Sequence, residues 1–109
     1  MRYKDLIVWQ KSHNLTIKTF NALKQIQRSY ASEVVIRQLL RAVSSVGANI
    51  AEGYGRHEGK EYLHFLEIAY GSSNEVDNWL TVLKDTNLMN AQIALDLLED
   101  NEEILKYLQ

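Results

Sequence analysis

Apolar residues recur at intervals of three and four along most of this chain of 109 residues, which is the spacing of one face of an α-helix. Together with the polar residues between them, they predict four helices, at about residues 6–27, from 33 to 50–52, 60–86, and from 91 onward. Consecutive helices joined by short connections run antiparallel. The sequence therefore predicts an all-α fold: an antiparallel up-down-up-down four-helix bundle, formed as one domain by residues 1–109.

Each predicted helix has an apolar stripe that is expected to face a shared core. In the first helix the stripe is Trp9, His13, Thr16, Phe20 and Leu23, with Val8, Leu15, Ala22 and Ile26 beside it. In the second helix the expected core positions are Ile36, Leu39, Val43, Val46 and Ile50. In the third they are Tyr62, Leu66, Ala69, Ser73, Val76, Leu80 and Leu83. In the fourth they are Ala94, Leu97, Leu98, Ile104, Leu105 and Leu108.

Small and polar residues mark the expected ends of these helices. Ser32 and Asn90 are candidate N-caps, because their side-chain oxygens can accept hydrogen bonds from the first backbone N–H groups of a helix. Gly53 is expected to end the second helix, and residues 53–59 form the clearest predicted loop. Gly71, in a run of small residues within the third helix, predicts a close approach of a neighbouring helix.

Composition agrees with a helical protein of a reducing compartment. The chain has no proline to interrupt helices, and it has no cysteine, which excludes disulfides, thiolate metal ligands and a cysteine nucleophile. No apolar run reaches the roughly 18 residues of a membrane-spanning helix, and the N-terminal segment is amphipathic. We therefore expect a cytoplasmic protein that is neither secreted nor inserted in a membrane.

Charge is distributed unevenly, although the formal net charge is only −2. Residues 1–60 contain ten Lys/Arg and four Asp/Glu, whereas residues 61–109 contain two and ten. The acids of the last helix are Asp96, Glu99, Asp100, Glu102 and Glu103. A basic flank of one subunit can meet an acidic flank of the next, and a head-to-tail contact of this kind generates rings. The asymmetry therefore favours a cyclic homo-oligomer.

No pattern in the sequence indicates catalysis or a cofactor. Five residues separate Gly53 from the Gly59–Lys60 pair and three separate Gly55 from it, whereas a phosphate-binding loop has four residues in between. Glu61 and His64 form a single Glu-x-x-His unit, which di-iron bundles use twice. We predict that the protein is not an enzyme and holds no metal. The alternative is a metal-dependent enzyme built on Glu61, His64 and Glu67.

A stripe of polar residues follows the second predicted helix. We call it the polar seam; it consists of Gln38, Arg41, Ser45, Asn49, Glu52 and Arg56. Ser and Asn are weak helix formers, so a purely solvated face gains nothing from them. The seam therefore favours a hydrogen-bonded interface or a pore lining over a surface that contacts only water.

Basic residues of the second helix and the following segment are candidate contacts for a nucleic acid or another partner, because phosphates are bound by Lys and Arg. These candidates are Arg37, Arg41, Arg56 and Lys60. The residues leave three hypotheses open for the partner. The protein binds RNA, or it binds a nucleic-acid enzyme, or it is a structural subunit that binds only another protein.

Five segments in fixed order carry a resemblance to a known family. They are residues 5–11 (DLIVWQK), 38–42 (QLLRA), 49–56 (NIAEGYGR), 61–66 (EYLHFL) and 69–72 (AYGS). They resemble the bacterial four-helix-bundle proteins of the 23S rRNA intervening-sequence family, and the resemblance as a whole extends over nearly the entire chain.

The resemblance implies an up-down bundle and a homopentameric ring, in a family whose biochemical activity is generally unassigned. Similar accessory proteins of diversity-generating retroelements form pentameric barrels and work with a reverse transcriptase and nucleic acid. Those proteins tend to be basic, whereas this chain has a pI near 5.9, which argues against strong RNA binding. We expect a non-enzymatic, homopentameric scaffold or binding protein that engages RNA or a nucleic-acid enzyme.

Overall fold

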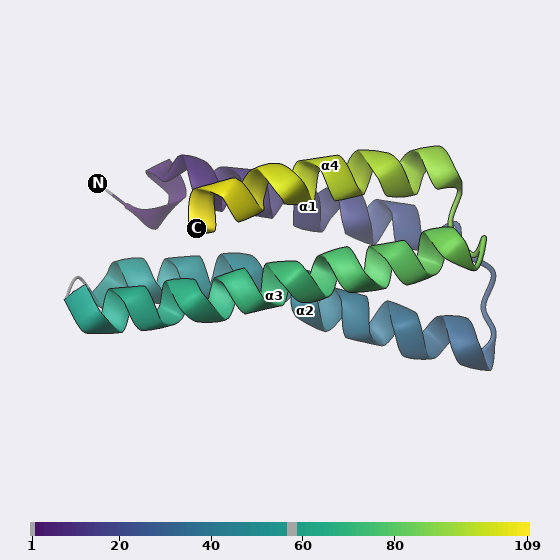
Figure 1. The fold of residues 1–109 in the computed structure, drawn as a ribbon, viewed down its shortest axis with the longest axis horizontal. Coiled ribbons are helices and arrows are strands. Elements are labelled where there is room, and N and C mark those ends of the chain that lie inside the picture. The colour runs from purple at the N-terminus through teal and green to yellow at the C-terminus, as the bar shows by residue number, and fades with distance from the viewer. Residues whose placement is uncertain (1, 57–58) are drawn as a thin grey trace.

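The computed structural model describes residues 2–56 and 59–109. A short 3-10 helix, η1 (Tyr3–Asp5), precedes α1 (Ile7–Leu23), α2 (Tyr30–Arg56), α3 (Gly59–Asp85) and α4 (Ala91–Leu108). The described residues contain no strand, and successive helices run in opposite directions (Figure 1). The predicted all-α, antiparallel four-helix bundle is therefore confirmed.

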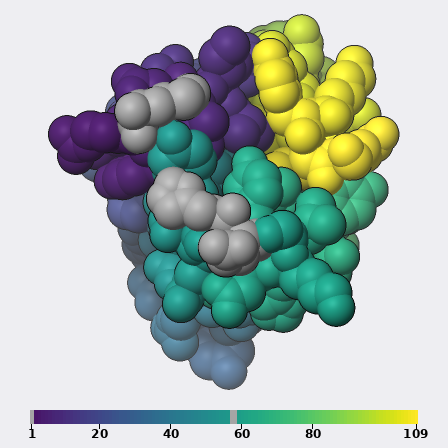
Figure 2. All heavy atoms as spheres, turned by 90° about the vertical axis from the view of Figure 1, so that its left-hand side faces the viewer, coloured from purple at the N-terminus to yellow at the C-terminus, as the bar shows by residue number. Residues whose placement is uncertain are grey.

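Each long helix packs against two others. α1 contacts α2 and α4, and α3 contacts the same two helices. α2 and α3 have 27 residues each, against 17 in α1 and 18 in α4, so the tip of the α2–α3 hairpin extends beyond the end of α4 (Figure 1). Seen from that tip, the first and last segments of the chain lie together on one side of the hairpin (Figure 2). None of the described helices is both long and apolar enough to cross a membrane.

The predicted apolar faces of α2, α3 and α4 form most of the core. On α2 every predicted core residue is buried, and Leu39 and Ile50 are fully inaccessible. On α3 the stripe is buried from Ala69 to Leu83, while Tyr62 and Leu66 nearer the hairpin tip are half-buried. On α4 the buried residues are Ala94, Leu97, Asn101, Ile104 and Leu105. Asn101 is the member of this set that the apolar pattern missed.

The predicted core face of α1 is wrong at its centre. Trp9 is half-buried, and both His13 and Phe20 are exposed. The buried side consists of Ser12, Leu15, Thr19 and Leu23. Gly47 of α2 lies so close to α1 that a Cβ atom on it would be 3.2 Å from the Oγ of Ser12. Small and hydroxyl side chains thus let α1 and α2 approach, and an apolar pattern does not detect them.

The connection between α1 and α2 also differs from the prediction. The α-helix ends at Leu23, and the next backbone bonds join residues three apart, as far as Ile26 N–H to Leu23 C=O at 3.3 Å. Ser29, not Ser32, caps α2. The backbone N–H of Ser32 donates to Ser29 Oγ at 3.1 Å, and the N–H of Ser29 donates to Ser32 Oγ at 2.8 Å. This reciprocal pair is a capping box with serine in both positions.

The predicted loop at residues 53–59 is wrong at residues 53–56 and at Gly59, because α2 continues to Arg56 and α3 begins at Gly59; residues 57 and 58 lie outside the described residues. Gly53 does not terminate the helix. It lies against α3, where a Cβ atom on it would be 3.0 Å from Phe65 Cβ and 3.3 Å from Tyr62 Cδ1. Gly71, expected at a close approach, is exposed, with no neighbouring atom within 4 Å of its would-be Cβ.

The last turn has the predicted cap. Asn90 Oδ1 accepts hydrogen bonds from the backbone N–H groups of Gln92 at 2.9 Å and Ile93 at 3.1 Å. Asn87 has a φ of 63°, a left-handed conformation that asparagine adopts more readily than most residues. These two asparagines reverse the chain between α3 and α4.

Candidate interaction surface

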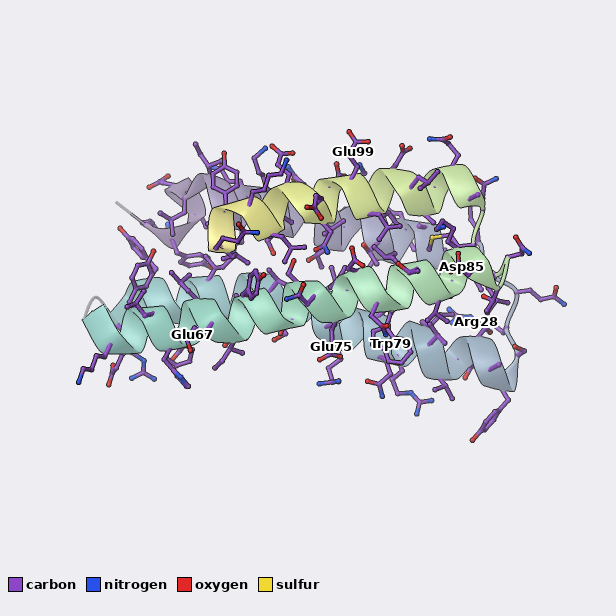
Figure 3. The ribbon with its side chains drawn as sticks, viewed as in Figure 1. Arg28, Glu67, Glu75, Trp79, Asp85 and Glu99 are labelled. Carbon is purple, nitrogen blue, oxygen red and sulfur yellow. The ribbon has the colours of Figure 1, made fainter. Side chains whose placement is uncertain are left out.

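The polar seam lies along the edge of α2 that faces α3, and its first contact crosses to that helix. Arg41 Nη2 donates to Gln38 Oε1 at 2.9 Å and to Glu75 Oε2 on α3 at 3.2 Å. Glu75 and Trp79 point from α3 toward the α2 side of the bundle in Figure 3. The side chains of Arg41 and Glu75 are 66% and 43% exposed, so this ion pair contributes little to stability.

The middle of the seam is a small hydrogen-bonded group. Ser72 Oγ on α3 donates to Ser45 Oγ at 2.9 Å. Asn49 Nδ2 donates to the backbone oxygen of Ser45 at 2.8 Å and lies 2.9 Å from its Oγ. All three side chains are half-buried. The Ser45–Ser72 bond therefore joins α2 to α3 within one subunit, and Asn49 bonds back to Ser45 on its own helix, which accounts for part of the presence of serine and asparagine on this face.

The end of the seam lies near the hairpin tip. Arg56 Nη2 donates to Glu52 Oε1 at 2.7 Å, one helical turn earlier. Its guanidinium also lies 5.5 Å from the centre of the Phe65 ring on α3, within the range of a cation–π contact. Each of the two seam arginines is thus paired with a carboxylate, and the four charged groups balance.

The α3 partners of the seam were not identified from the sequence. Phe65, Ser72 and Glu75 follow one another at spacings of seven and three, which places them on one side of α3. The spacing is visible in the sequence, but it identifies these residues as partners of the seam only when the side of α3 that faces α2 is known.

The structure does not bring the four candidate basic contacts together. Arg41 and Arg56 are in the seam, whereas Arg37 lines a groove beside the α1–α2 connection with Arg28. Lys60 is exposed in the first turn of α3. Along α2 alone, Arg37 and Arg56 are separated by roughly 28 Å at the rise of an α-helix. They form separate positive positions and not one compact phosphate site.

Part of the predicted charge asymmetry is neutralised inside a single subunit. Lys11 on α1 pairs with Glu103 on α4 at 2.6 Å, and Lys18 pairs with Asp100. The hydrogen bond that Lys11 donates to the Glu103 carboxylate raises the pKa of Lys11 above its ordinary value. The flanks of opposite sign therefore lie side by side in the fold, and only the charges outside these pairs are available to another subunit.

Glu61, His64 and Glu67 lie on exposed positions of α3. Within residues 2–56 and 59–109, no group of three or more His, Asp and Glu side chains is arranged to hold a metal ion. His64 instead lies edge-on to the neighbouring Phe65 ring, with 5.5 Å between the ring centres.

Comparison with known proteins places this bundle among its relatives. The model of the 23S rRNA-intervening sequence protein family matches residues 4–109. The chain belongs to the 23S rRNA-intervening sequence protein family. A search of proteins with curated descriptions gave no match.

A solved structure supports the same assignment. The crystal structure of a Bacteroides thetaiotaomicron protein, described as of unknown function and from the S23 ribosomal protein family, superposes with a TM-score of 0.85. The two chains are 28% identical, and the match covers 94% of each. The solved structure and the family model thus agree on the fold and on the relatives of the chain. The 23S rRNA-intervening sequence protein family has no assigned activity.

Proposed function

We propose that this member of the family is a non-enzymatic scaffold that assembles into a homopentameric ring. The observation that carries the proposal is the exposure of large apolar side chains on a subunit whose core is already closed. Among the described residues these are Ile7, Ile17, Phe20, Tyr30, Val34, Leu63, Ile68, Leu95 and Tyr107. Covering them in an assembly is favourable by about 25 cal/mol for each Å² removed from water. The number of subunits rests on the family resemblance.

The polar seam is proposed as a second contact surface, toward a neighbouring subunit or a protein partner. Arg41, Asn49 and Arg56 are held by hydrogen bonds to their own subunit, yet each keeps part of its side chain exposed. A surface that is ordered before binding loses less side-chain entropy when a partner arrives. Its balanced charges suit a polar protein surface better than a polyanion.

A second candidate function is weak binding of RNA by the same scaffold. The family's description and the exposed Arg37 and Lys60 favour it. Few phosphate contacts are expected, because both seam arginines are paired with carboxylates. Binding of a labelled single-stranded RNA should weaken with added salt, and Lys60→Ala should reduce the slope of log K against log salt by about one. Binding that does not respond to salt, or no binding at all, leaves a structural subunit with protein partners only.

Sedimentation velocity of the purified full chain tests the scaffold. The proposal predicts one assembled species that persists at micromolar concentration and does not dissociate on moderate dilution. A stable monomer of 12.6 kDa across that range contradicts it. Elemental analysis of the same sample tests the metal-dependent alternative, which requires stoichiometric iron, manganese or zinc.

A further inference from the structure

Several large apolar side chains are exposed on the two helix segments at the end of the bundle where α1 ends and α2 begins. Ile17 and Phe20 in the second half of α1 are 49% and 44% exposed, and Tyr30 and Val34 in the first turns of α2 are 89% and 42% exposed. The end of α1 and the start of α2 lie at the same end of the bundle (Figure 1). Exposed apolar groups of this kind are typical of protein contact sites.

A groove of about 420 Å³ opens at the same end, between α2 and the connection that precedes it. Ile36 and Leu40 provide its apolar lining, and Arg28 and Arg37 provide positive charge. Figure 3 shows Arg28 at this end of the molecule. Glu33 is the one acid among the described residues that line the groove. The groove therefore suits a partner that offers an apolar side chain flanked by carboxylates.

Helix α4 carries that combination on its outer face. Leu95, Glu99 and Glu102 follow at spacings of four and three, so they share one side of the helix. Leu95 is 49% exposed, and Glu99 points away from the other helices in Figure 3. Asp100 and Glu103 are paired with lysines of α1, whereas Glu99 and Glu102 form no ion pair with any described residue. These two glutamates are therefore available to another chain.

The groove and the α4 face also lie at similar heights along the bundle. α2 and α4 begin at the same end (Figure 1). Arg37 lies seven residues after the start of α2, and Glu99 lies eight residues after the start of α4. At the rise of an α-helix, both are roughly 10–12 Å from the start of their helices. Identical subunits around an axis parallel to the bundle close into a ring only if their mating surfaces share one height.

We propose that Leu95, Glu99 and Glu102 of one subunit dock into the Arg28–Arg37 groove of the next subunit. The inference rests on the proposed homo-oligomer and specifies which surfaces of neighbouring subunits contact each other. Leu95 covers the apolar lining, and the glutamates face the arginines. Because the two surfaces differ, the contact is head-to-tail. Arg37 then belongs to the subunit contact and not to an RNA site, and the polar seam borders this contact, because Arg41 lies one helical turn after Arg37 on α2.

Charge reversal tests this contact. Glu99→Arg and Arg37→Glu each place like charges in the interface, so each single variant should assemble at least about tenfold more weakly in sedimentation. The double variant E99R/R37E restores the attraction with reversed polarity and should recover assembly. Glu67→Arg is the matched control, because Glu67 is an exposed glutamate on the opposite side of the bundle from Glu99 (Figure 3) and its reversal should change nothing.

The outcomes separate this contact from the proposed function. A wild-type monomer overturns both the scaffold and the contact. A wild-type oligomer that is unaffected by either single reversal overturns the contact alone, and so does a double variant that stays as dissociated as the singles. Circular dichroism must show wild-type helix content for every variant, and recovery in the double variant shows that the singles lost assembly and not the fold.

Discussion

Ser73 on α3 and Asn101 on α4 form two hydrogen bonds to each other inside the core. Ser73 Oγ donates to Asn101 Oδ1 at 2.8 Å, and Asn101 Nδ2 donates to the backbone oxygen of Ser73 at 2.9 Å. Neither residue has any exposed surface. A buried polar pair is satisfied only in one register of the two helices, so it fixes how α3 and α4 align along the bundle.

Replacing one partner of this pair should destabilise the subunit. Asn101→Leu keeps the branched shape but removes the acceptor of the Ser73 hydroxyl, and it should lower the free energy of unfolding by about 1–3 kcal/mol. The double variant S73A/N101L leaves no stranded hydroxyl and should recover at least half of that loss. Urea denaturation of the three proteins provides the measurement. An Asn101→Leu variant as stable as the wild type would show that the pair does not matter.

Two glycines in helices should respond in opposite ways to alanine. Gly53→Ala places a Cβ atom 3.0 Å from Phe65 Cβ, which is fixed to the α3 backbone and cannot rotate away. We expect a loss of about 1–3 kcal/mol from overpacking between α2 and α3. Gly71→Ala, at an open and exposed position, should gain about 0.5–1 kcal/mol from helix propensity. Thermal unfolding that shifts in the same direction for both variants contradicts this assignment of close approach.

The start of α4 depends on the Asn90 cap. Asn90→Ala leaves two backbone N–H groups without their acceptor and should reduce stability by about 0.5–2 kcal/mol. Gln92→Ala is a suitable control, because the one bond of the Gln92 side chain to a described residue is to the exposed Asp96 of the same helix, at 3.2 Å. Urea denaturation should therefore separate the two variants, and equal stabilities would argue against the cap.

The Arg41–Glu75 pair should contribute little to the stability of a subunit. Both side chains are substantially exposed, and the coupling energy from a double-mutant cycle of Arg41→Ala and Glu75→Ala should be below about 1 kcal/mol. The same variants should weaken partner or subunit binding if the polar seam is a contact surface. A coupling energy well above that limit would give the pair a structural role instead.

Much of the fold follows from apolar periodicity in the sequence. The stripes of α2, α3 and α4 are strong because their core positions are mostly aliphatic, so their spacing alone locates the buried face. Asn90 was found because a cap acts through local hydrogen bonds. The face of α1 was misplaced because Ser12 and Thr19 are buried there, and the close packing at Ser12 depends on Gly47 of another helix.

The errors at the candidate surface have the same origin. Gly53 resembles a helix terminator in the sequence, but its role comes from Phe65 and Tyr62 on the opposite helix. The seam was identified on α2, yet its partners on α3 could not be assigned before the two helices were placed side by side. Asn101 gave no signal, because a buried asparagine and an exposed one look alike in a pattern of apolar residues.

Native mass spectrometry of the purified full chain tests the central proposal most directly, because it counts subunits. Assembly into a homopentameric ring predicts a dominant species with five times the mass of the 12.6 kDa chain, without bound metal. A spectrum in which the single chain dominates at micromolar concentration would contradict the account.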